Sequence, residues 1–253
     1  MNKSNILFLH IPKTAGTTIQ TGFQNIVENN KNIRFYKGAS PGLNDQFSIK
    51  YFDKINFDTN FNILKGHFVF SEACRDFKLF SMVRDVVDLF ISNLYFFYHA
   101  QYLRINLNSE NINKIKKKIN LDLKLSDEDI ETISELLSNN FVNSNIITKT
   151  FAGIPFEKFF FVTEDYKLLE DDFNHACENL NLFSYIGNTE NINKFLNVFL
   201  EYVPVNSFEV RSKRFFKKDQ KLIHSIKNSL TSQIEEYNYY DKKIVEVIKR
   251  KFN

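Results

Sequence analysis

The chain has 253 residues, of which 33 are basic and 30 acidic, so its formal net charge is only +3. This small charge argues against a nucleic-acid-binding protein, and a hydrophobic content of 43% excludes an intrinsically disordered chain. No stretch approaches the roughly 18 apolar residues that cross a membrane, the amino terminus has no signal-peptide core, and the two cysteines, Cys74 and Cys177, are too few for a disulfide framework. We therefore expect a soluble, cytoplasmic protein with a single domain over residues 1–253.

The pattern of apolar residues predicts strands that alternate with helices. In chain order, strands are expected at residues 5–11, 62–66, 77–83 and 158–163. Helices are expected at residues 17–28, 85–104, 109–150 (with a start signal at 126–129), 165–180 and 219–253. Residues 31–60 are expected to form irregular surface structure. Strands separated by helices favour a parallel sheet that is covered on both faces, so the predicted class is α/β.

The segment after the first predicted strand has the composition of a phosphate-binding loop. It reads Pro12-Lys-Thr-Ala-Gly-Thr-Thr18 and leads directly into a predicted helix. The amides and the positive dipole end of that helix favour an anion, Gly16 lets the backbone approach a ligand closely, and Lys13 adds a mobile positive charge. Further hydrogen-bond donors are the hydroxyls of Thr14, Thr17 and Thr18. The alternative interpretation is an ordinary strand-to-helix turn that is capped by a threonine.

This loop differs from the nucleotide-triphosphate loop. That loop requires Gly, four residues and then Gly-Lys-Ser/Thr, whereas here Lys13 precedes the only glycine of the segment, Gly16. The order of the residues therefore argues against an ATPase or a GTPase.

A second candidate anion site follows the third predicted strand. That strand ends at Val83, Arg84 and Asp85 come next, and Ser92 lies on the following predicted helix. Because the carboxyl ends of parallel strands meet at one sheet edge, Arg84 is expected on the same edge as Lys13. A guanidinium and a hydroxyl together suit a terminal phosphate. The alternative is a surface pair between Arg84 and Asp85, with Ser92 on an ordinary helix face.

Together, these segments resemble the sulfotransferases, most closely the branch typified by heparan-sulfate 2-O-sulfotransferase and its bacterial relatives. The resemblance is carried by His10-Ile-Pro-Lys-Thr-Ala-Gly-Thr-Thr18, Gly66-His67-Phe68 and Val83-Arg-Asp-Val-Val-Asp-Leu-Phe-Ile-Ser92, and more weakly by residues 136–153, 161–164 and 241–245. Two positions depart from the family pattern. Val86 stands where the family usually has proline, and Asp88 stands where it commonly has arginine.

The resemblance implies a P-loop-like three-layer sandwich and the donor 3′-phosphoadenosine 5′-phosphosulfate, with no metal. The 5′-phosphosulfate is expected to contact the loop residues Lys13, Thr14, Ala15, Gly16, Thr17 and Thr18. The 3′-phosphate is expected to contact Arg84 and Ser92. A basic segment closer to the carboxyl terminus offers further candidates for the 3′-phosphate, namely Arg211, Lys213 and Arg214.

The resemblance also implies the catalytic residues. Lys13 is expected to neutralise the charge that develops on the leaving phosphate oxygen. His67, which follows Gly66, is expected to be the base that takes the proton of the acceptor hydroxyl, since an unperturbed imidazole is largely neutral at pH 7. The alternative for His67 is a hydrogen-bonded structural histidine, and His10 and His99 are weaker candidates for catalysis.

The expected function is sulfuryl transfer to a hydroxyl of a carbohydrate or glycolipid acceptor. A protein tyrosine, a lipid or a small alcohol remains an open alternative as acceptor. The alternative enzyme is a kinase of the P-loop superfamily, for which the predicted strand that ends near Asp165 would hold magnesium. The alternative outside enzymes is a non-catalytic module that binds an adenosine bisphosphate.

Overall fold

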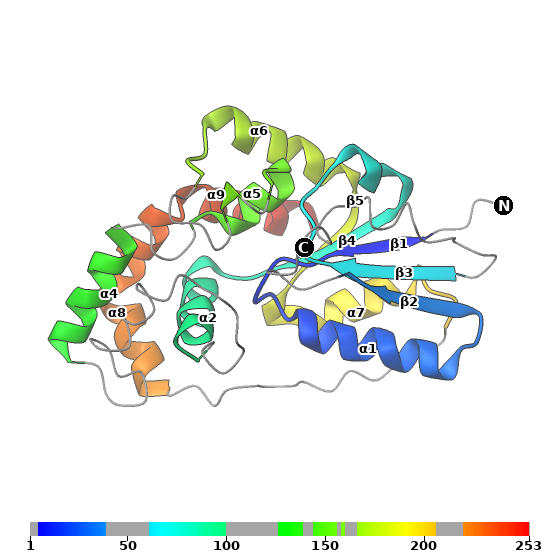
Figure 1. The fold of residues 1–253 in the computed structure, drawn as a ribbon, viewed down its shortest axis with the longest axis horizontal. Helices are drawn as coiled ribbons and strands as arrows, with labels where there is room; N and C mark the ends of the chain where they lie inside the picture. The colour runs from blue at the N-terminus through cyan, green and yellow to red at the C-terminus, as the bar shows by residue number, and fades with distance from the viewer. Residues whose placement is uncertain are drawn as a thin grey trace.

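The fold is built on a five-stranded parallel sheet with the strand order β2-β3-β1-β4-β5 (Figure 1). It is seen in a computed structural model, which describes residues 5–38, 61–99, 126–138, 144–155, 158–159, 166–205 and 220–252. The strands are β1 (Ile6–Leu9), β2 (Ile33–Lys37), β3 (Phe61–Gly66), β4 (Lys78–Val83) and β5 (Phe183–Asn188). Because all five run in the same direction, their carboxyl ends lie at one edge of the sheet.

Helices cover both faces of this sheet (Figure 1). The described helices are α1 (Gly16–Asn29), α2 (Val86–His99), α4 (Asp127–Ser138), α5 (Ile146–Ala152), α6 (Glu170–Asn179), α7 (Ile192–Leu200), α8 (Gln220–Tyr237) and α9 (Tyr239–Phe252). α1 and α7 pack on one face, where Phe8 of β1 lies 5.8 Å from Phe195 of α7 between ring centroids. α5, α6 and α9 pack on the other face, where Leu7 shares a buried cluster with Ile147 and Ile244. The expected α/β class and three-layer arrangement are confirmed.

The sequence of β1 explains its central position. Successive strand residues point to opposite faces of a sheet, so a strand that is covered on both sides must be apolar throughout. All four residues of β1 are apolar and fully buried. β1 therefore joins the two hydrophobic layers and carries the loop that follows it at the centre of the sheet edge.

The carboxyl-terminal helices are joined to the rest of the molecule by buried polar contacts. The carboxylate of Asp241, at the start of α9, accepts hydrogen bonds from the Ile147 amide at 3.0 Å and from the Thr148 amide and hydroxyl at 2.7 and 2.8 Å. Burial raises the pKa of Asp241 to about 6. On the neighbouring helix, Gln233 donates to the Ser134 hydroxyl of α4 at 2.8 Å. α5 and α4 are thereby fixed to α9 and α8.

Most of the predicted elements are confirmed, with ends shifted by a few residues. They are the strands at 5–11, 62–66 and 77–83 and the helices at 17–28, 85–104, 165–180 and 219–253, as far as the described residues extend. The predicted helical region 109–150 contains α4 and α5, and its parts at 109–125 and 139–143 lie outside the described residues. The start signal is confirmed, because Ser126 and Asp129 exchange hydrogen bonds at the beginning of α4.

Three predictions about strands and helices were wrong or incomplete. Residues 31–60 do not form irregular structure throughout, because β2 occupies 33–37 at the edge of the sheet. β5 and α7 were not predicted at all. Of the predicted strand at 158–163, only 158 and 159 are described, and there the Lys158 amide donates to the Pro155 carbonyl, as in a turn. The described edge strand beyond β4 is β5, later in the chain.

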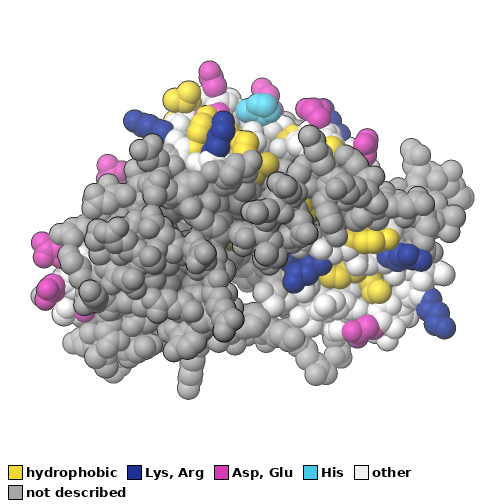
Figure 2. Space-filling view, in the orientation of Figure 1, with side chains coloured by type: hydrophobic (Ala, Val, Ile, Leu, Met, Phe, Trp, Pro, Cys, Tyr) yellow, Lys and Arg dark blue, Asp and Glu magenta, His cyan; other side chains and the backbone are white. Residues whose placement is uncertain are grey.

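The surface of the described residues carries mixed charge. On the face that Figure 2 shows, basic and acidic side chains are interspersed over the described regions. No helix within the described part of the chain combines the length and apolarity that membrane crossing requires.

Candidate functional site

Three of the predicted segments leave the sheet at the same edge. β1 pairs in parallel with β3 and β4, and Leu9 at the end of β1 is level with Gly66 at the end of β3. The loop after β1, His67 after β3 and Arg84 after β4 therefore lie at this carboxyl edge. The side chains of Lys13 and Arg84 are close enough to interact. Burial and the charge of Arg84 lower the pKa of Lys13 to about 8. Lys13 and Arg84 thus share one edge, as expected from the sequence.

The loop between β1 and α1 has an unusual backbone. Lys13 and Ala15 adopt left-handed conformations, with φ values of 65° and 61°. Such conformations cost of order 1–3 kcal/mol each in non-glycine residues and are concentrated at functional sites. The alternative interpretation, in which a threonine caps the helix, is wrong, because the N-cap residue of α1 is Ala15 and makes no side-chain cap hydrogen bond. The first amides of α1 and its positive dipole end are therefore left to an anion.

The hydroxyls of the loop differ in what they can do. Thr14 is fully buried, and its hydroxyl donates to the Ile11 carbonyl at 2.7 Å. The Thr14 proton therefore stabilises the loop, which differs from its expected use as a donor to a ligand. Thr17 is exposed and Thr18 half-buried in the first turn of α1, so these two hydroxyls are the better placed to reach a ligand.

Gly16 allows α1 to approach the end of β1 closely. A Cβ atom at residue 16 would lie 1.7 Å from Nε2 of His10 and 2.1 Å from Cε1 of the same ring. The imidazole of His10 is buried, and its Nε2 has no hydrogen-bond partner among the described residues. The glycine is therefore required by a contact within the protein, between the start of α1 and His10, whatever a ligand adds.

Gly16→Ala is expected to lower the free energy of unfolding by about 1–3 kcal/mol, because the added methyl group must displace either His10 or α1. Urea denaturation measures this change. Gln24→Ala, at an exposed position of the same helix, is the control and is expected to change stability by less than about 0.5 kcal/mol. Equal stability of the Gly16→Ala variant and the unmodified protein would contradict the contact.

Arg84 is a partly buried cation whose Nε has no hydrogen-bond acceptor among the described residues. Its Nε is shielded from solvent and has no hydrogen-bond partner in the described parts of the chain. Burial lowers the pKa of Arg84, while the carboxylates of Asp88, Asp85 and Glu190 act in the opposite direction from a distance. A buried donor without an acceptor is unfavourable. An anion that binds at this nitrogen would satisfy it.

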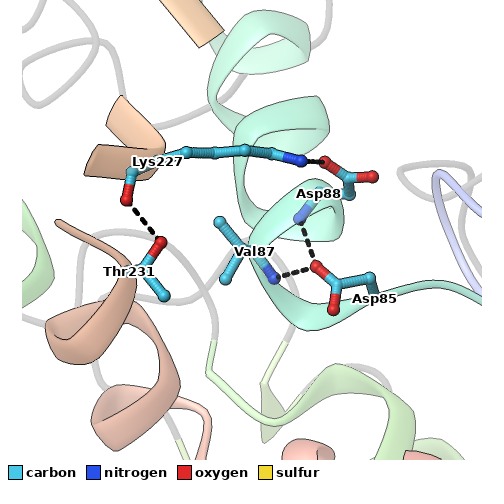
Figure 3. Close-up of polar contacts among 5 residues, drawn as sticks. All are labelled: Asp85, Val87, Asp88, Lys227 and Thr231. Atoms are coloured by element: carbon cyan, nitrogen blue, oxygen red, sulfur yellow. Dashed lines mark hydrogen bonds and ion pairs between the residues drawn. The ribbon is translucent and has the colours of Figure 1, made fainter. Parts of the chain in front are cut away.

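Asp85 caps α2 (Figure 3), and no ion pair between it and Arg84 is found. Its Oδ1 accepts hydrogen bonds from the amides of Val87 at 3.0 Å and Asp88 at 3.1 Å. Asp88, which stands where the sulfotransferase pattern commonly has arginine, forms an ion pair with Lys227 of α8 at 2.8 Å. The alternative of a surface pair between Arg84 and Asp85 is therefore wrong, and α8 is anchored to α2.

The remaining predicted ligand-binding residues are less well defined. Ser92 is 6% exposed on α2, whose first residue follows the Arg84-Asp85 pair. Its contact with a phosphate stays a prediction. Arg211, Lys213 and Arg214 and the side chain of His99 lie outside the described residues. Within the described residues, no group of three His, Cys, Asp or Glu side chains is arranged to hold a metal ion.

The structure defines the tautomer and the charge state of the His67 ring. Its Nδ1 lies 2.9 Å from the carbonyl oxygen of His10 and donates to it, so the lone pair of the neutral ring is on Nε2. Burial and the positive charge of Lys65 lower the pKa of His67 to about 3, although the hydrogen bond to His10 acts in the opposite direction. The imidazole is therefore neutral at pH 7, which is the form that accepts a proton.

Lys65 is a buried cation that the sequence analysis did not single out. It is only 4% exposed, and its Nζ lies 3.3 Å from Nδ1 of His10. Burial and the charge of Lys37 lower the pKa of Lys65 to about 7. The signal in the sequence was a lysine inside the otherwise apolar end of a strand, Ile63-Leu-Lys-Gly66, where a strand covered on both faces should be apolar.

Comparisons with known proteins do not identify a function for this chain. No protein family and no characterised protein matches this sequence. Among solved structures, mouse sulfotransferase SULT7A1 complexed with PAP is similar over 93% of this chain and 67% of that chain, with 11% identity and a TM-score of 0.42. A similarity of this degree is too low to transfer a function.

Proposed function

We propose that this protein is a sulfotransferase that moves a sulfuryl group from 3′-phosphoadenosine 5′-phosphosulfate to a hydroxyl group. The observation that carries the proposal is the presence of two cationic sites at one sheet edge. One is the start of α1 with Lys13, where no side chain caps the helix, and the other is Nε of Arg84, which has no partner in the described part of the chain. An adenosine with anionic groups at both its 5′ and 3′ positions can occupy both sites. The resemblance of the loop and of residues 83–92 to sulfotransferases supports the same donor.

The proposed reaction is a direct transfer between two oxygen atoms. Nε2 of His67 takes the proton of the acceptor hydroxyl, and the acceptor oxygen forms a bond to sulfur. The bond between sulfur and the 5′-phosphate oxygen breaks at the same time. Adenosine 3′,5′-bisphosphate leaves with the bonding electron pair, and the ammonium of Lys13 neutralises the charge on its 5′-phosphate. The proton remains on His67 until it is lost to solvent.

The charges around His67 favour proton transfer only after the donor has bound. In the free protein, the cations Lys65 and Lys37 lower the pKa of His67. A donor with several negative charges near the same ring raises that pKa again, because an opposite charge favours the imidazolium form. His67 is thus expected to become the stronger base when the donor is in place.

We propose a carbohydrate or glycolipid as the acceptor, and the resemblance alone supports this choice. The test is transfer of radiolabelled sulfate from the donor to a panel of glycans, glycolipids, tyrosine peptides and small alcohols. Label in a glycan or glycolipid supports the proposal. Label only in a peptide or a small alcohol would support sulfotransferase activity but contradict a carbohydrate or glycolipid acceptor.

Adenosine 3′,5′-bisphosphate is expected to stabilise the protein against heat in the absence of magnesium, by about 2.7 kcal/mol at a concentration 100 times its Kd. Arg84→Ala is expected to weaken this binding about 10- to 100-fold, because a hydrogen bond to a charged group contributes roughly 1.5–3 kcal/mol. Thermal-shift titration measures both effects. Arg75→Ala, which removes an exposed arginine paired with Glu72, is the matched control.

The same titration separates the alternatives. Equal affinity of the unmodified protein and the Arg84→Ala variant would remove Arg84 from the site. Stabilisation only by ATP with magnesium would favour a kinase. Stabilisation by the bisphosphate without sulfate transfer to any acceptor would favour a binding module.

A further inference from the structure

Lys65 is buried, and it has no carboxylate partner among the described residues. Its hydrogen bond is to Nδ1 of His10 at 3.3 Å, and no carboxylate of the described residues lies within ion-pair distance. The strand register places it level with Phe8 of β1 and Lys37 of β2, and neither a phenyl ring nor a second cation compensates a buried ammonium. This arrangement is unfavourable for folding. Unfavourable buried charges of this kind are concentrated at functional sites.

The contact of Lys65 leads directly to the His67 ring. The His10 amide donates to the Gly66 carbonyl at 2.8 Å, and the His10 carbonyl accepts from Nδ1 of His67 at 2.9 Å. The two imidazole rings lie 4.1 Å apart between centroids, with 33° between their planes. The protonated form of Lys65 can only donate, so in that form His10 accepts at Nδ1 and carries its proton on Nε2. The hydrogen bond from Lys65 thus links its charge to the orientation and the tautomer of the ring that packs against His67.

We propose that Lys65 is a positioning residue for His67 and acts through His10. The hydrogen bond from Lys65 holds the His10 ring between Gly16 and His67, and the fixed ring and carbonyl of His10 keep the His67 imidazole in place with its proton on Nδ1. The inference rests on the proposed function, in which His67 is the base. Lys65 itself is directed at His10 and is not assigned a contact with the reacting atoms.

Hydrogen bonding and charge can be separated at this position. The charged groups that face the two histidines are Lys13 in the loop, Lys37 on β2 and Lys65 on β3. Lys65 and Lys37 lower the pKa of His67, so the loss of either charge raises it. Of the described lysines, only Lys65 forms a hydrogen bond with the His10 ring. Lys65→Met removes the bond and the charge with little change in shape, whereas Lys65→Gln removes the charge and keeps a donor.

The test uses the full chain and two kinds of measurement. Nitrogen-15 NMR of the histidine rings gives the tautomer and titration of His67 and His10 without any donor present. Steady-state kinetics gives kcat and KM, and titration with adenosine 3′,5′-bisphosphate gives its Kd. Lys78→Met is the matched control, because Lys78 is an exposed lysine at the opposite, amino-terminal end of the sheet.

For Lys65→Met, kcat is expected to fall about 10- to 100-fold with an unchanged Kd for the bisphosphate, as for the loss of a group that orients a reacting residue. The His67 ring is expected to lose its single Nδ1–H tautomer and to titrate at a higher pH. Lys65→Gln is expected to keep the Nδ1–H tautomer of His67 and most of kcat. Only the pH at which His67 titrates is expected to rise. If Lys65→Met does not fold, the Gln variant still tests the separate effect of the charge.

Unchanged kcat and unchanged histidine tautomers in Lys65→Met would overturn the inference. Equal damage in the folded Met and Gln variants would also overturn it, because the hydrogen bond would then not be the link. The proposed function fails separately, if the unmodified protein neither binds the bisphosphate nor transfers sulfate. In that event the NMR comparison still decides whether Lys65 controls His67, since it requires no donor.

Discussion

His67→Ala is expected to reduce sulfuryl transfer about 10²- to 10⁴-fold, the usual contribution of a general base, while the affinity for adenosine 3′,5′-bisphosphate stays unchanged. The two effects separate because the phosphate-binding groups belong to other segments. The ring of His67 follows β3, whereas the start of α1 and Arg84 follow β1 and β4. Transfer of radiolabelled sulfate and a thermal-shift titration measure the two quantities on the same preparations.

Two controls distinguish a lost base from a damaged fold. His175→Ala removes an exposed histidine of α6 and is expected to leave transfer unchanged. Added imidazole is expected to restore part of the activity of His67→Ala, since a free base can enter the space that the side chain leaves. A His67→Ala variant with near-normal turnover would show that another group takes the proton. Loss of bisphosphate binding together with transfer would instead assign His67 to the structure of the site.

The position of the site could be predicted from the sequence because its segments are local. Residues 6–18 form a strand, a loop and a helix start in one continuous stretch, and Arg84 directly follows a well-marked apolar strand. Parallel strands then bring both segments to one edge without any knowledge of side-chain packing. The central strands could also be predicted from local sequence, because a strand buried on both faces is a continuous apolar run.

The contacts inside the site could not be predicted because they join distant parts of the chain. The pair of Lys65 and His10 joins β3 to β1, and the ion pair of Asp88 and Lys227 joins α2 to α8. The edge strand β2 was missed for a related reason. Only Ile33 of its five residues is fully buried, so exposed side chains interrupt the apolar pattern.

Asp88 illustrates how a departure from a family pattern changes the site. The sulfotransferase resemblance leads one to expect an arginine there, one helical turn after Arg84. The carboxylate of Asp88 instead forms an ion pair with Lys227 and partly offsets the lowering of the Arg84 pKa by burial. Because Lys227 is already paired with Asp88, the proposed 3′-phosphate contact at the start of α2 rests on Arg84 among the described basic side chains. This makes its substitution more informative than it would be beside a second arginine.

Lys13→Ala is expected to lower kcat about 10²- to 10³-fold, comparable to the loss of one donor that stabilises transition-state charge. Bisphosphate affinity is expected to fall by a smaller factor. The difference arises because the negative charge on the leaving oxygen grows as the bond to sulfur breaks, so the ammonium contributes more in the transition state than in the bound complex. Lys31→Ala, at an exposed position beyond the far end of α1, is the control for the loss of one lysine.

The pH dependence gives a second and independent test of Lys13. Burial and the charge of Arg84 lower its pKa to about 8 in the free protein, so Lys13 is charged below that pH and loses its proton above it. Because kcat/KM reports the ionisations of the free enzyme, it is expected to fall as the pH rises through about 8. Lys13→Arg keeps the charge at all accessible pH values and should remove the part of the decline near pH 8 even if its maximal rate is lower. A decline near pH 7 from Lys65 would remain in this variant. An identical decline in the Lys13→Arg variant would show that a different group titrates, and Lys13 would then lose its assigned part in the departure of the bisphosphate.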